Sequence, residues 1–277
     1  MTGVSLKDIS SLSPQSSQHV ITVSHYAQII GSLSLFTIPC LLFAYLTHPR
    51  PFHYLGLRKP GKPVQWLLVA GTMLGFLFLS IYLENLVMSH IKLSKDMQAM
   101  QNQNNNHMKG MLSLRSAGGF ILTFFSMAVL TPFSEEVMFR GTLLRFAHKS
   151  TRRTVFPIVI TAALFMFIHE NPYGMPFIFI AGVLLACMYY FTGSLWCSIL
   201  AHFLYNGIQV VYSYVAVNQP AGTVATEENL PVWLAVSGGI VFLVSLYALI
   251  KNKTPLPADW SDDYLGEQRP EQTGLKF

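Results

Sequence analysis

The sequence predicts an all-α integral membrane protein, a polytopic bundle of about seven transmembrane helices. Only 11% of its 277 residues are charged and 52% are hydrophobic, whereas an ordinary soluble domain carries about 25% charged residues. The apolar runs have the length of about 20 residues that a helix needs to cross a bilayer. Helices are required because lipid cannot satisfy free backbone groups. The expected segments are residues 26–47, 64–88, 117–139, 154–171, 175–193, 195–214 and 232–250.

The chain divides into three expected parts. Residues 1–116 hold a polar leader, two transmembrane helices and a polar low-complexity loop. Residues 117–214 form a core of four membrane helices, and residues 215–277 add the last helix and a tail rich in Pro, Asp and Glu. The Gln- and Asn-rich tract at 98–106 is too polar to bury a core, so we expect a mobile loop there, and we expect the tail to be disordered.

The basic residues indicate the orientation in the membrane, because Lys and Arg collect in cytoplasmic loops. They cluster at 50–62, at 140–153 and at 251–253. This pattern predicts a multi-pass protein with a cytoplasmic C-terminus, in the plasma or inner membrane if the host is bacterial. The loop at 89–116 is an exception, since it would lie outside and yet contains four basic residues. The net charge of +5 lies in loops between apolar segments, so we expect membrane lipid as a partner and no nucleic acid.

Ionisable side chains inside membrane segments are costly and are therefore candidates for function. Adjacent residues on a helix point about 100° apart, while residues four apart share a face. Glu136 should therefore pair with Arg140, and Glu135 points elsewhere without an evident partner. A carboxylate without a counter-ion suits the role of a general base. The other candidates are His169, His202 and Asn206, whereas Glu84 lies near a segment end and favours no functional role.

Three motifs connect these residues to a known family. Glu135 to Arg140 matches EExxxR, Phe165 to His169 matches FxxxH, and His202 to Asn206 matches HxxxN. In this order, on membrane helices, they resemble the CPBP family of intramembrane proteases. That family includes the Ras-converting CAAX endopeptidase and bacterial relatives linked to bacteriocin immunity. The resemblance covers about residues 117–210.

The resemblance implies a helical protease core around a water-accessible cavity, and it implies hydrolysis of a peptide bond in a hydrophobic or lipidated substrate. By position, Glu135 would activate water with the help of His169, and His202 and Asn206 would stabilise the oxyanion. Glu136 and Arg140 would hold the first motif in place. We favour a mechanism without a cofactor, but zinc bound by Glu135, His169 and His202 stays open.

Two other functions are consistent with the same residues. The chain could be a non-catalytic membrane binding or immunity factor, or a transporter that relays protons through its Glu and His side chains. A transporter would favour internal repeats and broken helices, and the sequence contains no evident repeat.

Overall fold

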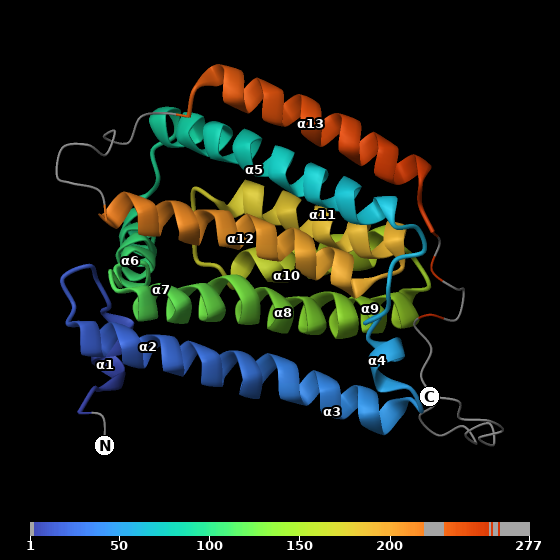
Figure 1. Ribbon diagram of the computed structural model, residues 1–277, viewed down its shortest axis with the longest axis horizontal. Helices are drawn as coiled ribbons and strands as arrows, with labels where there is room; N and C mark the ends of the chain where they lie inside the picture. The colour runs from blue at the N-terminus through green and yellow to red at the C-terminus, as the bar shows by residue number, and fades with distance from the viewer. Residues whose placement is uncertain (1–2, 219–229, 255, 257–259, 261–277) are drawn as a thin grey trace.

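The computed structural model describes residues 3–218, 230–254, 256 and 260, and every regular element within these residues is a helix. The prediction of an all-α membrane bundle is confirmed (Figure 1). The elements are α1 (Leu6–Ser10), α2 (Gln18–Gly31), η1 (Ser32–Thr37), α3 (Ile38–Thr47), α4 (Pro51–Tyr54), α5 (Val64–His90), α6 (Lys95–Met111), α7 (Ala117–Thr123), η2 (Phe124–Leu130), α8 (Thr131–Glu136), η3 (Val137–Leu143), α9 (Leu144–Thr151), α10 (Val155–Phe167), α11 (Met175–Thr192), α12 (Leu195–Asn218) and α13 (Val232–Lys251). Elements labelled η are π-helical turns within longer helices.

Five helices among the described residues are long and apolar enough to cross a membrane, whereas the sequence predicted about seven. They are Gln18–Thr47, Val64–His90, Ala117–Thr151, Met175–Thr192 and Val232–Lys251. The fourth expected segment is shorter than predicted because α10 ends at Phe167. The sixth corresponds to α12, which places His202, Asn206 and other polar side chains in the bundle interior.

The long helices lie side by side along one axis (Figure 1). The continuous helix α2–η1–α3 flanks the helix α7–α9, and α10, α11 and α12 lie between that helix and α5. Helix α13 packs along α5, where Gly75 and Gly238 let the backbones approach closely. A Cβ atom at Gly75 would lie only 2.6 Å from the carbonyl oxygen of Gly238. Small residues allow this contact in a membrane, where close packing rather than the hydrophobic effect holds helices together.

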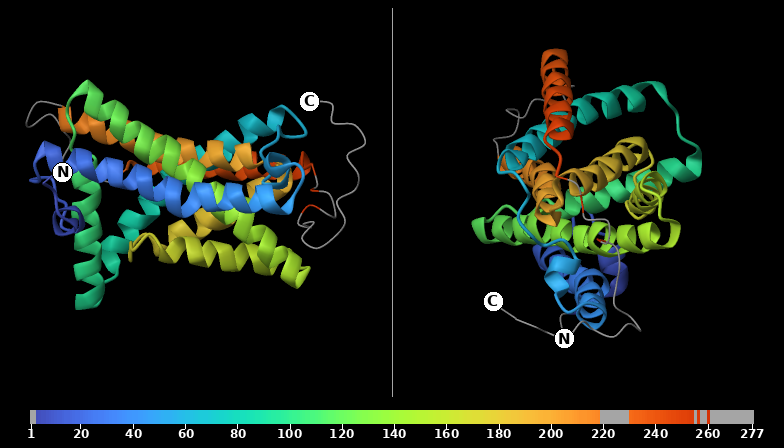
Figure 2. Two further views of the ribbon diagram at one scale, coloured as in Figure 1. Left: turned by 90° about the horizontal axis from the view of Figure 1, so that it is seen from below. Right: turned by 90° about the vertical axis from the view of Figure 1, so that its right-hand side faces the viewer.

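The polar tract at 98–106 is helical, so the prediction of a loop there is wrong. It lies within α6, which crosses one end of the bundle at a steep angle to the other helices (Figure 2, left). The Ser94 side chain caps the helix by accepting a hydrogen bond from the Met97 amide. Gln101 is buried and accepts a hydrogen bond from the amide of Tyr173. Contacts with other segments thus accompany a helix in a tract whose composition alone predicts a loop.

Most of the tail that we expected to be disordered lies outside the described residues. Three of its residues, Thr254, Leu256 and Trp260, are described, and all three contact the bundle. The amide of Thr254 donates to the carbonyl of Phe191, and Trp260 is buried against Tyr189 and Tyr190.

Candidate active site

One cavity of about 360 Å³ lies inside the bundle and contains residues from all three motifs. Its wall includes Glu135 from α8, Phe165 from α10 and His169 from the turn that follows α10. His202 and Asn206 come from α12. Segments that are distant in sequence therefore deliver these side chains to a shared interior space, as the resemblance to CPBP proteases implied.

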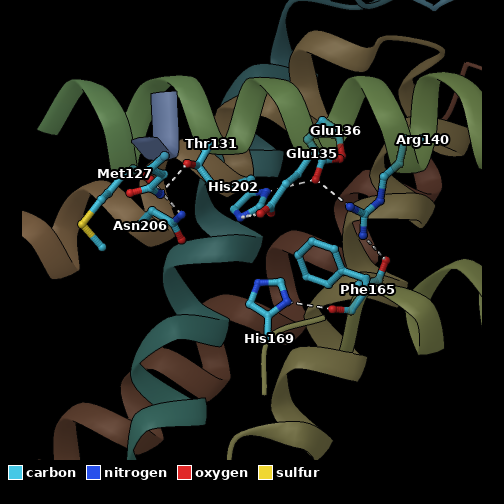
Figure 3. Close-up of polar contacts among 12 residues, drawn as sticks. Met127, Thr131, Glu135, Glu136, Arg140, Phe165, His169, His202 and Asn206 are labelled. Carbon is cyan, nitrogen blue, oxygen red and sulfur yellow. Dashed lines mark hydrogen bonds and ion pairs between the residues drawn. The ribbon is translucent and has the colours of Figure 1, made fainter. Parts of the chain in front are cut away.

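Glu136 lies at the centre of a buried polar cluster (Figure 3). Its Oε1 atom accepts hydrogen bonds from Arg140 Nη1 at 2.7 Å and from His202 Nδ1 at 3.0 Å. Its Oε2 atom accepts a hydrogen bond from the hydroxyl of Ser198. Glu136 and Arg140 are both 0% exposed. The predicted pair between them exists, and the carboxylate also orients the first residue of the HxxxN motif.

Arg140 links the first motif to the neighbouring helices. Its Nη2 atom donates to the carbonyl oxygen of Gly182 on α11 at 3.0 Å. Its guanidinium lies over the ring of Phe165, 4.7 Å from the centroid. A buried charge is tolerated only when it is paired and hydrogen-bonded, and these contacts fix Arg140 between α10 and α11.

Glu135 points into the cavity, beside Nε2 of His202 (Figure 3). The residue is 8% exposed, and its Oε2 atom has no hydrogen-bond partner among the described residues. That oxygen lies 3.7 Å from His202 Nε2, which is beyond hydrogen-bonding distance. The two adjacent carboxylates thus differ as predicted: Glu136 is saturated by partners and Glu135 is open.

His169 reaches the cavity on the other side of Phe165 (Figure 3). The ring of Phe165 is 4.5 Å from the ring of His169 and 5.7 Å from the ring of His202. His169 Nδ1 bonds to the Phe165 carbonyl at 2.7 Å, which fixes the orientation of the imidazole. The FxxxH spacing was expected to lie within one helix, but His169 follows the end of α10, in a turn where Glu170 has a φ of 47°.

Asn206 depends on a local break in the helix α7–α9. In the i to i+5 pattern of η2, the partner of the Met127 carbonyl would be the nitrogen of Pro132, which has no hydrogen. The Nδ2 atom of Asn206 donates to this carbonyl at 3.1 Å. The proline therefore leaves a free acceptor, which holds the Asn206 amide at the cavity wall.

The candidate metal ligands do not form a compact set. Within the part of the chain that the structure describes, no three His, Cys, Asp or Glu side chains are close enough together to hold a metal ion. The ring of Phe165 lies between the imidazoles of His169 and His202 and separates them. The arrangement therefore does not fit a zinc ion bound by Glu135, His169 and His202.

Sequence reasoning missed several residues of the site. Glu84 lines the cavity, although its place near a segment end indicated no role. Gln28 on α2 also lines it and donates to Thr131 Oγ1 at 2.9 Å. Asn104 on α6 lines it and donates to the carbonyls of His169 and Glu170. These residues belong to no motif, and only the tertiary packing reveals them.

The cavity extends from Glu135 toward the end of the bundle that carries α6. Its outer wall contains Asn104 and Met108 from α6 together with Ser213 near the end of α12. The basic residues at 50–62, around α4, and at 145–153, in and after α9, lie at the opposite end (Figure 1). The cavity therefore extends toward the end of the bundle that carries fewer Lys and Arg residues.

Comparison with known proteins finds a family match in the central part of the chain. Residues 117–208 match the family model described as type II CAAX prenyl endopeptidase Rce1-like. No curated protein sequence and no solved structure matches the chain. The matched range contains all three motifs, whereas Gln28, Glu84 and Asn104 lie outside it. The resemblance to CPBP proteases is confirmed over this range: residues 117–208 of this multi-pass membrane chain are similar to the Rce1-like type II CAAX prenyl endopeptidase family of intramembrane proteases.

Proposed function

We propose that the chain hydrolyses peptide bonds within the membrane, with Glu135 as the general base that activates water. One observation carries this proposal: of the two adjacent buried carboxylates, only Glu135 has an oxygen without a partner, and it lines the cavity. Glu136 is already bound by Arg140, Ser198 and His202. A group saturated in this way is a poor proton acceptor, so the base is Glu135.

The proposed reaction proceeds in two steps. Glu135 accepts a proton from a water molecule while the water oxygen attacks the carbonyl carbon of the scissile bond. The carbonyl oxygen becomes an oxyanion in the tetrahedral intermediate. The carbon–nitrogen bond then breaks as the proton on Glu135 passes to the leaving nitrogen. The products are a new C-terminal carboxylate and a free amine. His169 would help to orient the attacking water from its side of the cavity.

His202 and Asn206 would bind the oxyanion. Donors that are held in place before the reaction lower the barrier, and removing one costs about 10²–10³ in rate. Because a carboxylate only accepts hydrogen bonds, Nδ1 of His202 carries a proton toward Glu136. Donation from Nε2 to the oxyanion therefore requires the doubly protonated imidazolium, flanked by Glu135 and Glu136.

The substrate would be a hydrophobic or lipidated peptide segment. The cavity is lined by apolar side chains such as Met73, Phe177 and Leu185 as well as by the polar motif residues. An apolar wall with a few converging polar groups is typical of substrate sites. The family description adds prenylated CAAX proteins as one substrate class to be tested.

The test is cleavage of fluorescence-quenched hydrophobic peptides, with and without a prenylated CAAX end, by the purified full-length protein. Glu135→Gln, His169→Ala and His202→Ala should each lose most of the activity while remaining folded in detergent. Full activity in all three variants would contradict the proposed mechanism. If a strong chelator removes activity and zinc restores it, the glutamate-only mechanism is wrong.

A non-catalytic binding or immunity factor is the second candidate. It would bind the same peptides with unchanged affinity after Glu135→Gln, and the wild-type protein would cleave none of them.

A further inference from the structure

We propose that Glu84 forms a subsite of the cavity that binds a positively charged group of the peptide substrate, about three residues from the scissile bond. This inference rests on the proposed function and adds a selectivity that the motifs do not contain. Glu84 belongs to α5, outside the range that matches the protease family. Its side chain nevertheless lines the same cavity as Glu135, His169 and His202.

The Glu84 carboxylate lines the cavity with no Lys or Arg beside it among the described lining residues. The side chain of Asn171 interacts with the carboxylate, and an amide contributes no net charge. Two carboxylates, those of Glu84 and Glu135, line the cavity, and none of the described lining residues is Lys or Arg. The proposed imidazolium of His202 lies next to Glu135 at the other end of the cavity. A low-dielectric wall that carries a carboxylate attracts a positive charge. A Lys or Arg side chain, or a free amino group, fits this wall, and a carboxylate does not.

The neighbouring helices fix how far the subsite lies from the site of cleavage. Helices α5 and α12 run in the same direction (Figure 1), and two contacts align them. The Ser80 hydroxyl lies 3.5 Å from the Tyr205 hydroxyl, and the rings of Phe76 and Tyr205 stack with centroids 6.5 Å apart. Ser80 and Tyr205 are therefore at the same level along the bundle.

The distance follows from the rise of the helix. Glu84 lies four residues beyond Ser80, and His202 lies three residues before Tyr205. At about 1.5 Å per residue, these offsets separate Glu84 from His202 by about 10 Å along the bundle axis. An extended peptide advances about 3.3 Å per residue. A substrate that passes from His202 toward α6 would therefore place its third residue or so beside Glu84.

The experiment measures charge selectivity with the full-length protein in detergent. A set of quenched hydrophobic peptides carries Lys, Gln or Glu in turn at each of the four positions on either side of the scissile bond. For the wild-type protein we expect kcat/KM about tenfold higher for Lys than for Glu at one position about three residues away, in the range for a hydrogen bond between charged groups. The difference should lie mainly in KM.

Three variants separate charge from structure. Glu84→Gln should remove the preference, and Glu84→Lys should reverse it so that Glu is cleaved better than Lys. Asn171→Ala removes the neighbouring amide but keeps the charge, so it should retain the preference for Lys. Glu170→Gln is the matched control, because Glu170 is exposed and lies outside the cavity wall; it should behave as the wild type does.

Binding separates this inference from the proposed function. The same peptides are titrated against Glu135→Gln, with and without the Glu84→Lys change, and their affinities are measured by fluorescence anisotropy. If the wild-type protein cleaves no peptide, the proposed hydrolysis is contradicted, while a charge preference in binding would still support the subsite. If binding and cleavage show no preference between Lys and Glu, or if Glu84→Lys leaves the preference unchanged, the subsite is wrong.

Discussion

The carboxylate of Glu136 accepts a hydrogen bond from Nδ1 of His202 at 3.0 Å, which joins the first motif to the last. The same oxygen pairs with Arg140, so one buried atom determines the position of two motif side chains. The contact also turns Nε2 of His202 toward Glu135 and the cavity. Glu136 is therefore best described as a positioning residue.

Glu136→Gln should destabilise the protein, whereas Glu135→Gln should not. The first change leaves the buried Arg140 without its counter-ion, and breaking a buried ion pair costs about 3–5 kcal/mol. Thermal unfolding in detergent should show a clearly lower midpoint for Glu136→Gln and a midpoint close to wild type for Glu135→Gln. Equal midpoints for Glu136→Gln and the wild type would mean that the pair has no structural role.

Asn206→Asp should reduce the rate of cleavage with little effect on substrate binding. The change keeps the size of the side chain but removes the Nδ2 donor that bonds to the Met127 carbonyl and would face the oxyanion. Losing such a donor costs about 10²–10³ in kcat. Steady-state kinetics should show this loss with KM nearly unchanged. A variant that keeps its kcat would remove Asn206 from the proposed oxyanion site.

Helix α6 should bind less tightly to the bundle at acidic pH. Burial lowers the pKa of His107 on this helix below its usual 6.5, because the charged form is disfavoured there. The state in which α6 packs against the bundle therefore favours neutral His107. The contribution of His107 to the stability of this packing is fully present above pH 6.5 and declines as the pH falls below this value. Amide exchange of α6, corrected for intrinsic rates, should be faster at pH 5 than at pH 7.5. His107→Gln should reduce this difference; an unchanged difference would contradict the assignment.

The cavity should open toward the side of the membrane opposite the C-terminus. The cavity extends toward α6 and away from the basic residues at 50–62 and 145–153. If these basic residues and the C-terminus are cytoplasmic, as the charge pattern predicts, the α6 end of the bundle lies on the other side of the membrane. In a background without the native cysteines, Gln103→Cys at an exposed position of α6 should react with a membrane-impermeant maleimide on intact cells. Arg153→Cys should react only after the cells are opened. The reverse labelling pattern would place the cavity mouth in the cytoplasm.

The arrangement of Glu135, Glu136 and Arg140 could be predicted from the sequence because it depends on residues close together in one helix. Spacing of four residues on a helix was enough to pair Glu136 with Arg140 and to separate Glu135 from both. The shared cavity of Glu135, His169 and His202 was also expected from three motifs in one order.

The remaining features depend on contacts between distant segments. Glu84 lines the cavity because α5 packs beside α12, where Ser80 contacts Tyr205. No local sequence pattern predicts this contact. The helical state of α6 depends on partners such as the Tyr173 amide and the carbonyl of His169. Composition describes a segment in isolation and therefore predicted a mobile loop for this one.

The most direct test of the central claim is a comparison of peptide termini in membranes that contain the wild-type protein or Glu135→Gln at equal abundance. If Glu135 activates the water that cleaves the substrate, new C-termini should form only with the wild-type protein, and in H₂¹⁸O they should carry one ¹⁸O atom. Identical sets of termini in the two membranes, or equal cleavage by Glu135→Gln, would contradict the proposed mechanism.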